Sequence, residues 1–150
     1  MANPFYKKHV VTLVNAFREL DGFTDELRAS ELQPERVRAI EMYERVLVLL
    51  KTVDTIPLPK KVRMAARDVG DYAYLLSELL RTQAKPTKTM VIPAATEAQK
   101  YSDEGRKTTV RLNKRNFEKM RLYRAKAAET LRQPSLDYGQ AHEKVLAEAL

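Results

Sequence analysis

The sequence contains no cysteine, only four glycines and only two histidines. Without cysteine, a disulfide framework and any thiolate metal site are excluded. His9 and His142 lie far apart with no HExxH spacing, so no metal site is expected. The glycines form no phosphate-cradling loop of the GxxxxGK[ST] type. We therefore expect no cofactor and no enzymatic activity.

Long apolar runs are also missing. No stretch approaches the roughly 18 uncharged apolar residues of a membrane span, and the opening Met1–Pro4 has no apolar signal region. The hydrophobic share of 44% is nevertheless normal for a folded protein. We expect a cytoplasmic protein, with no membrane contact, of one ordinary domain or two small ones.

The net charge of +7 is distributed unevenly. Residues 1–84 hold 13 Lys and Arg against 12 Asp and Glu, whereas residues 85–150 hold 14 against 8. This asymmetry is typical of a basic module joined to a neutral one. A solvated basic face without a ligand is the competing interpretation.

Residues 1–84 have the apolar spacing of three helices. The first is expected to end at Gly22, the second to begin at Pro34, and the third to begin at about Lys60. Three helices suffice for a small bundle, and no catalytic pattern accompanies them. We expect this bundle to contact an unknown protein partner or to support oligomerisation, with residues 85–105 as a linker.

The segment from Lys107 to Leu112 alternates in character. Thr108, Val110 and Leu112 fall on one face of an extended chain, and Lys107, Thr109 and Arg111 fall on the other. This pattern predicts a short strand with an apolar face and a cationic face.

Asn113 is predicted to cap the helix that follows this strand. The apolar side of that helix is expected to carry Phe117, Met120, Tyr123 (or Leu122), Ala127 and Leu131, while its exposed side carries Lys119, Arg121, Arg124 and Lys126. Pro134 is predicted to end this helix, and Ser135 to cap a last one that runs to the chain terminus.

One strand and two short helices bury too little surface to fold alone. Pairing with an identical chain would join two strands into an antiparallel ribbon over four helices. A two-stranded ribbon fits the major groove of DNA. The sequence therefore predicts a homodimer, with higher order if the N-terminal helices also associate.

The residues from about Arg106 to Leu150 resemble the ribbon-helix-helix family (MetJ/Arc/CopG type) of DNA-binding proteins. The resemblance rests on residues 108–113, 117–120 and 132–137, and on Val145-Leu146. It implies base contacts by Lys107, Thr109 and Arg111. It also implies phosphate contacts by Lys114 and Arg115 and at a helix start formed by Ser135, Leu136 and Asp137.

The expected fold is mainly α: a three-helix bundle in residues 1–84 and a ribbon-helix-helix module in residues 106–150. The leading hypothesis is a homodimeric, sequence-specific protein that binds double-stranded DNA as a transcriptional repressor or a DNA-transfer or partition accessory factor. The alternative is a helical structural or assembly subunit of a larger nucleoprotein particle, which binds nucleic-acid backbone without sequence readout. An antitoxin-like protein is disfavoured by the size of the N-terminal bundle.

Overall fold

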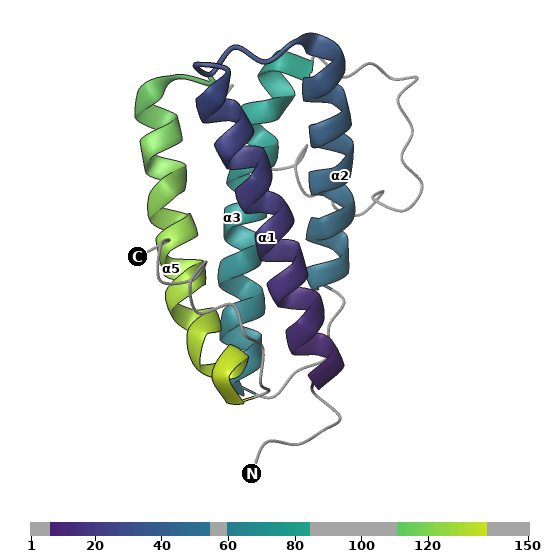
Figure 1. The fold of residues 1–150 in the computed structure, drawn as a ribbon, viewed down its shortest axis with the longest axis vertical. Coiled ribbons are helices and arrows are strands. Elements are labelled where there is room, and N and C mark those ends of the chain that lie inside the picture. Colours follow the sequence, from purple (N-terminus) through teal and green to yellow (C-terminus); the bar gives the residue numbers. More distant parts are fainter. Residues whose placement is uncertain (1–6, 55–59, 85–110, 138–150) are drawn as a thin grey trace.

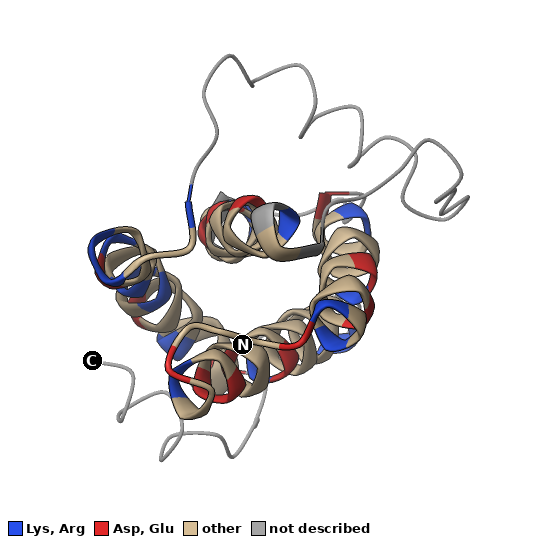
Figure 2. Ribbon diagram, turned by 90° about the horizontal axis from the view of Figure 1, so that it is seen from above, with Lys and Arg blue, Asp and Glu red and all other residues tan. Residues whose placement is uncertain are grey.

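The computed structural model describes residues 7–54, 60–84 and 111–137, and these ranges contain four α-helices. They are α1 (Lys7–Ala29), α2 (Arg36–Asp54), α3 (Lys60–Ala84) and α5 (Lys114–Asp137). Successive helices run in opposite directions, so that α2 and α5 both begin at the upper end in Figure 1. Helix α3 contacts each of the other three, whereas α2 and α5 lie on opposite sides of the bundle without contact (Figure 2).

One continuous hydrophobic core joins the four helices. Helix α1 contributes a stripe at helical spacing that includes Val10, Leu13 and Phe17, each fully buried. Helix α5 contributes Phe117 and Met120, among others, to this same core. Burying a large apolar side chain stabilises the fold by about 1.5–3 kcal/mol, so these contacts hold α5 against the bundle. Its described residues complete the bundle of α1, α2 and α3 and do not form a second core.

The mainly α class is confirmed, but the ribbon-helix-helix fold is wrong. The described residues contain no strand. Arg111 and Leu112, the described end of the predicted strand, have no regular structure, and Lys107–Val110 lie outside the described residues. A paired ribbon is needed only if the C-terminal unit has no other surface against which to bury its apolar face. Helices α1 and α3 bury that face within one chain, so no second chain is required for it.

The predicted helix break at Pro134 is also wrong, because α5 continues through it to Asp137. A proline so close to the end of a helix withholds only one backbone hydrogen bond. Pro134 and Ser135 are both buried and extend the packed side of Leu131. Packing therefore outweighs the local cost. Residues 138–150, where the last helix was expected, lie outside the described residues, as does the expected linker of residues 85–105.

Helix α1 does not end at Gly22 but continues for seven more residues to Ala29. Its last turn closes in a Schellman motif, in which the Leu32 N–H donates to the Leu27 carbonyl at 2.9 Å and the Glu31 N–H donates to the Arg28 carbonyl at 3.0 Å. Glu31 and Leu32 have φ values of 55° and 63°. Because glycine usually occupies the first of these positions, the sequence has no local signal for this helix end.

Candidate nucleic-acid interface

The start of α5 is fixed by the predicted cap. The Asn116 N–H donates to Asn113 Oδ1 at 2.8 Å, and the Phe117 N–H donates to the Asn113 carbonyl at 2.9 Å. The side-chain amide of Asn116 also donates to the Arg111 carbonyl at 2.8 Å. The backbone just before the helix is thereby tied to its first turn, and the Asn113 cap is confirmed.

Four cations lie within two turns of this cap, and we name them the cationic cluster: Arg111, Lys114, Arg115 and, one turn beyond Arg115, Lys119. All four are exposed. The first turn of α5 has no acidic residue, so the positive end of the helix dipole adds to their field. Within the described part of the chain, no carboxylate lies within ion-pair distance of any of the four. Figure 2 shows Lys and Arg at this corner of the bundle.

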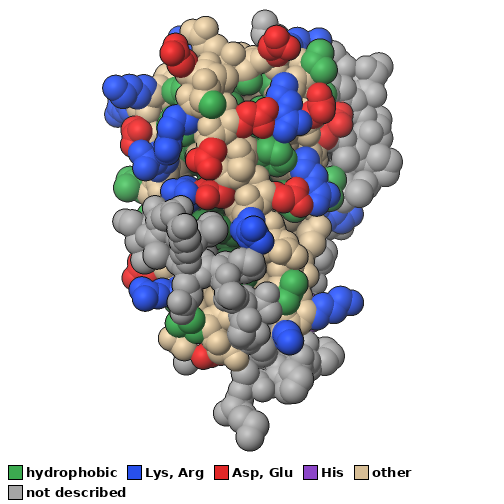
Figure 3. Space-filling model, in the orientation of Figure 1, with side chains coloured by type: hydrophobic (Ala, Val, Ile, Leu, Met, Phe, Trp, Pro, Cys, Tyr) green, Lys and Arg blue, Asp and Glu red, His purple; other side chains and the backbone are tan. Residues whose placement is uncertain are grey.

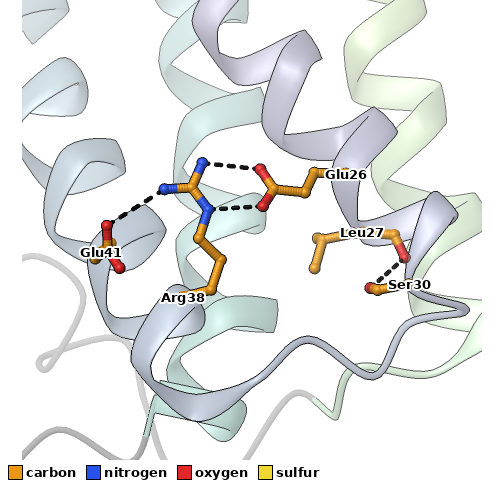
Figure 4. A network of polar contacts seen from close by, with 5 residues as sticks. All are labelled: Glu26, Leu27, Ser30, Arg38 and Glu41. Atoms are coloured by element: carbon orange, nitrogen blue, oxygen red, sulfur yellow. Dashed lines mark hydrogen bonds and ion pairs between the residues drawn. The ribbon is translucent and has the colours of Figure 1, made fainter.

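The cations between α1 and α2 are different, because acidic side chains neutralise them. Arg38 Nε and Nη2 donate to the two oxygens of Glu26 at 2.6 and 2.9 Å, and Nη1 lies 3.5 Å from Glu41 (Figure 4). Arg45 likewise donates two hydrogen bonds of 2.7 Å to Glu19. These hydrogen bonds lower the pKa of both partner carboxyls, Glu19 and Glu26. Over α1 and α2, acidic and basic side chains accordingly lie side by side (Figure 3).

The residues predicted to bind DNA are only partly brought together. Lys107 and Thr109 lie outside the described residues. Arg111, Lys114 and Arg115 adjoin one another at the start of α5. Since Arg111 precedes a helix in irregular backbone, nothing in the described chain presents it on a ribbon.

The second predicted phosphate site is at the opposite end of the same helix. Ser135, Leu136 and Asp137 form the last turn of α5, about 30 Å from Lys114 at 1.5 Å per residue. Ser135 is only 1% exposed, and a helix C-terminus carries the negative end of the dipole. The premise of a helix starting at Ser135 is wrong, so these residues offer no free amides to a phosphate.

Arg124 was expected among the exposed cations, and that expectation is wrong. It is buried, and its Nη2 donates to Asp21 Oδ2 at 2.8 Å while its Nε donates to Oδ1. The hydrogen bonding to Asp21 raises the pKa of Arg124. Sequence spacing contained the signal, because Arg124 falls on the apolar stripe of Phe117, Met120, Ala127 and Leu131. Arg124 therefore fastens α5 to α1 and is withdrawn from any ligand.

A buried hydroxyl pair adjoins this ion pair. The hydroxyls of Tyr72 and Thr24 are hydrogen bonded at 2.5 Å, and both residues are fully buried. Burial raises the pKa of Tyr72, which keeps its hydroxyl neutral. The Thr24 hydroxyl also donates to the Leu20 carbonyl at 2.9 Å, so the hydroxyl pair and the ion pair are each hydrogen bonded within the interior and are closed to a ligand.

The surface between α3 and α5 is shallowly hollowed. A hollow of about 240 Å³ is lined by Asp71, Tyr74, Leu75, Lys119 and Tyr123. Tyr123, expected on the apolar side of α5, is 37% exposed, and the alternative Leu122 is 71% exposed. The inward position of this turn is taken by Arg124, the residue after Tyr123. The Asp71 carboxyl has a raised pKa because it is partly buried and lies near Asp68.

Neither a metal site nor a bilayer-spanning helix occurs in the described ranges. No three His, Asp or Glu residues come together there in a way that could hold a metal ion. None of the described helices has the length and hydropathy needed to cross a membrane. Comparison of the chain with family models, with curated proteins and with solved structures gave no match.

Proposed function

We propose that this protein binds nucleic acid through the phosphate backbone, using the cationic cluster of α5, and does not select a base sequence. The observation that supports the proposal is the contrast in pairing. Arg38 and Arg45 are neutralised by carboxylates of their own chain, whereas no carboxylate of the described residues forms an ion pair with the four cations of the cluster. Unneutralised cations at the positive end of a helix are suited to phosphate oxygens.

Backbone binding accounts for the arrangement better than base readout. Sequence readout in a groove needs several side chains that present hydrogen-bonding groups to base edges from one inserted element. The middle of the exposed face of α5 instead carries Leu122, which offers no hydrogen bond. This favours the role of a helical structural or assembly subunit of a nucleoprotein particle.

The proposal predicts a salt-dependent affinity that is lost with the cluster. In Arg111→Gln/Lys114→Gln/Lys119→Gln, binding of a fluorescent duplex should weaken at least about tenfold at 0.15 M salt, measured by anisotropy. The slope of log K against log salt should become less negative by up to about 3. A matched control is Lys8→Gln/Arg18→Gln/Arg28→Gln, which removes the same charge from exposed positions of α1.

Equal losses in the two triple variants would show that net charge alone drives binding, and the cluster would then have no special role. Competition between random and defined duplexes tests the second half of the proposal. Backbone binding predicts preferences of no more than about threefold, whereas specific readers commonly exceed 10³-fold. A strong preference for one sequence would contradict the proposal.

A further inference from the structure

The outward face of α5 has a charge pattern centred on Leu122. Leu122 is 71% exposed, more than any other large hydrophobic residue that the structure describes. Arg115 lies seven residues before Leu122, and Glu129 lies seven residues after it. Glu118 lies four residues before Leu122, and Lys126 lies four residues after it. All four charged residues are exposed. If the helix is reversed end to end about Leu122, Arg115 exchanges places with Glu129 and Glu118 with Lys126, so each position changes the sign of its charge.

These five residues share one side of the helix. Seven residues make almost two full turns, so Arg115, Leu122 and Glu129 lie nearly in line along the axis. Residues four apart are neighbours on a helix surface, which places Glu118 and Lys126 beside this line. The stripe is thus an apolar centre with alternating charges on both sides of it.

This antisymmetry suits a two-fold axis. In an antiparallel pair of α5 helices crossing at Leu122, the two Leu122 side chains meet. Arg115 then faces Glu129 of the partner, and Glu118 faces Lys126 of the partner, with each pair occurring twice by symmetry. A parallel pair would instead oppose like charges. We infer that α5 mediates self-association, and that the partner of this surface is a second antiparallel copy of the chain.

Existing contacts of these side chains compete only weakly with such a partner. Glu118 lies 3.5 Å from Arg121, and Lys126 Nζ lies 3.9 Å from Asp68 Oδ1. The Lys126 side chain is 63% exposed and the Glu118 side chain 55%. The pair of Glu118 and Arg121 is exposed on both sides and contributes little to stability. Asp68 is buried, but at 3.9 Å its pair with Lys126 is long, and the exposed Lys126 side chain can turn toward a partner.

The stripe and the cationic cluster use different cations, apart from Arg115. Lys114 and Lys119 are not required for any of the four cross-helix pairs, so a dimer would leave them available for phosphate. The two Asn113 caps would lie about 27 Å apart at 1.5 Å per residue, one at each end of the helix pair. A single helix pair buries less than the roughly 1,000 Å² of a stable interface, so the dimer should be weak, with a dissociation constant of about micromolar or higher.

A charge-exchange experiment on the full chain tests this inference. In Glu118→Lys, both cross-helix pairs become Lys against Lys, and in Lys126→Glu both become Glu against Glu. Each single variant should self-associate at least about tenfold more weakly than the wild type in sedimentation equilibrium. An equimolar mixture of the two variants restores an attractive pair at both sites. It should therefore form a heterodimer with an affinity within about threefold of the wild-type dimer, and the double variant Glu118→Lys/Lys126→Glu should recover homodimerisation.

Both positions are exposed, so each variant should fold like the wild type, which circular dichroism checks. A wild type that stays monomeric at millimolar concentration would overturn the inference. It would also be overturned if the single variants dimerise like the wild type, or if the mixture fails to associate. Association with a different acidic or basic protein in place of self-association would likewise contradict it. None of these outcomes depends on nucleic acid, so failure here leaves the proposed function untouched.

Discussion

At the scale of single residues, the buried pair of Arg124 and Asp21 has the largest consequence for the fold. Both residues are less than a tenth exposed, and the guanidinium meets the carboxylate with two parallel hydrogen bonds. Removing both charges from water is costly, so such a pair need not stabilise the fold relative to well-packed apolar residues. Its demonstrable effect is geometric, because it fixes which turn of α5 lies against which turn of α1.

The pair predicts a strongly asymmetric mutational response. Arg124→Ala should lower the free energy of unfolding by about 3–5 kcal/mol, because it leaves the Asp21 carboxylate buried without its partner. The double variant Asp21→Leu/Arg124→Leu should lose much less, since no charge remains unpaired. Urea unfolding followed by circular dichroism measures both. If the double variant loses as much as the single variants Asp21→Leu and Arg124→Leu together, the side chains are not coupled and the ion pair does not join α1 to α5 as described.

At the scale of helices, local signals and packing disagree at two places. Gly22 and Pro134 both suggest a helix end, yet α1 and α5 continue through them. In each case the buried stripe continues beyond the breaking residue, through Thr24 and Leu27 in α1 and through Ser135 in α5. A glycine inside a helix costs only about 1 kcal/mol relative to alanine, which is less than the burial that follows it.

Continuation of α1 through Gly22 predicts that Gly22→Ala is stabilising. A Cβ at this position would meet nothing within 4 Å, so the substitution should raise the free energy of unfolding by about 0.5–1 kcal/mol. Gly70→Ala in α3 is a companion variant, because its Cβ would make ordinary contacts of 3.9 Å with Leu50 and Val53. Chemical denaturation of the two variants is the measurement. A destabilised Gly22→Ala variant would mean that the backbone there is not helical.

At the scale of the whole molecule, α1 and α3 each contact all the other described helices, and α3 makes the most extensive contacts, with α2 and with α5. Helix α5 has its apolar side against α3 and α1, and its outward side carries the cationic cluster and the charged residues around Leu122. The cations that could meet a ligand are therefore on a helix whose position depends on the other three. We therefore expect variants that loosen the packing of α5 also to weaken binding of nucleic acid by the cationic cluster.

A fragment of residues 106–150 should consequently not fold alone. Phe117, Met120 and Leu131 would lose the α1 and α3 surfaces that bury them, and a short isolated helix is marginal in water. Its circular dichroism should show little helix and no cooperative thermal transition, whereas the intact chain should unfold cooperatively. A folded fragment that sediments as a dimer would instead support the paired-ribbon arrangement and contradict the packing described here.

The sequence alone determined the features that depend only on residues within one or two helical turns of one another, together with the overall composition. The mainly α class follows from apolar spacing, the cap at Asn113 from the residue type and its position, and the basic character of the C-terminal part from composition. Such features depend on neighbours close in the chain, which is why they can be recognised without a structure. The mutual proximity of Arg111, Lys114 and Arg115 belongs with them.

Tertiary structure decided which surfaces meet. An apolar helix face must be buried, but its sequence does not say whether a second chain or an earlier part of the same chain buries it. In this protein α1 and α3 bury it, which removes the need for a ribbon and turns Arg124 inward to Asp21. The same packing selects the charges that remain exposed, because a cation is available to a ligand only where no carboxylate of the fold lies beside it.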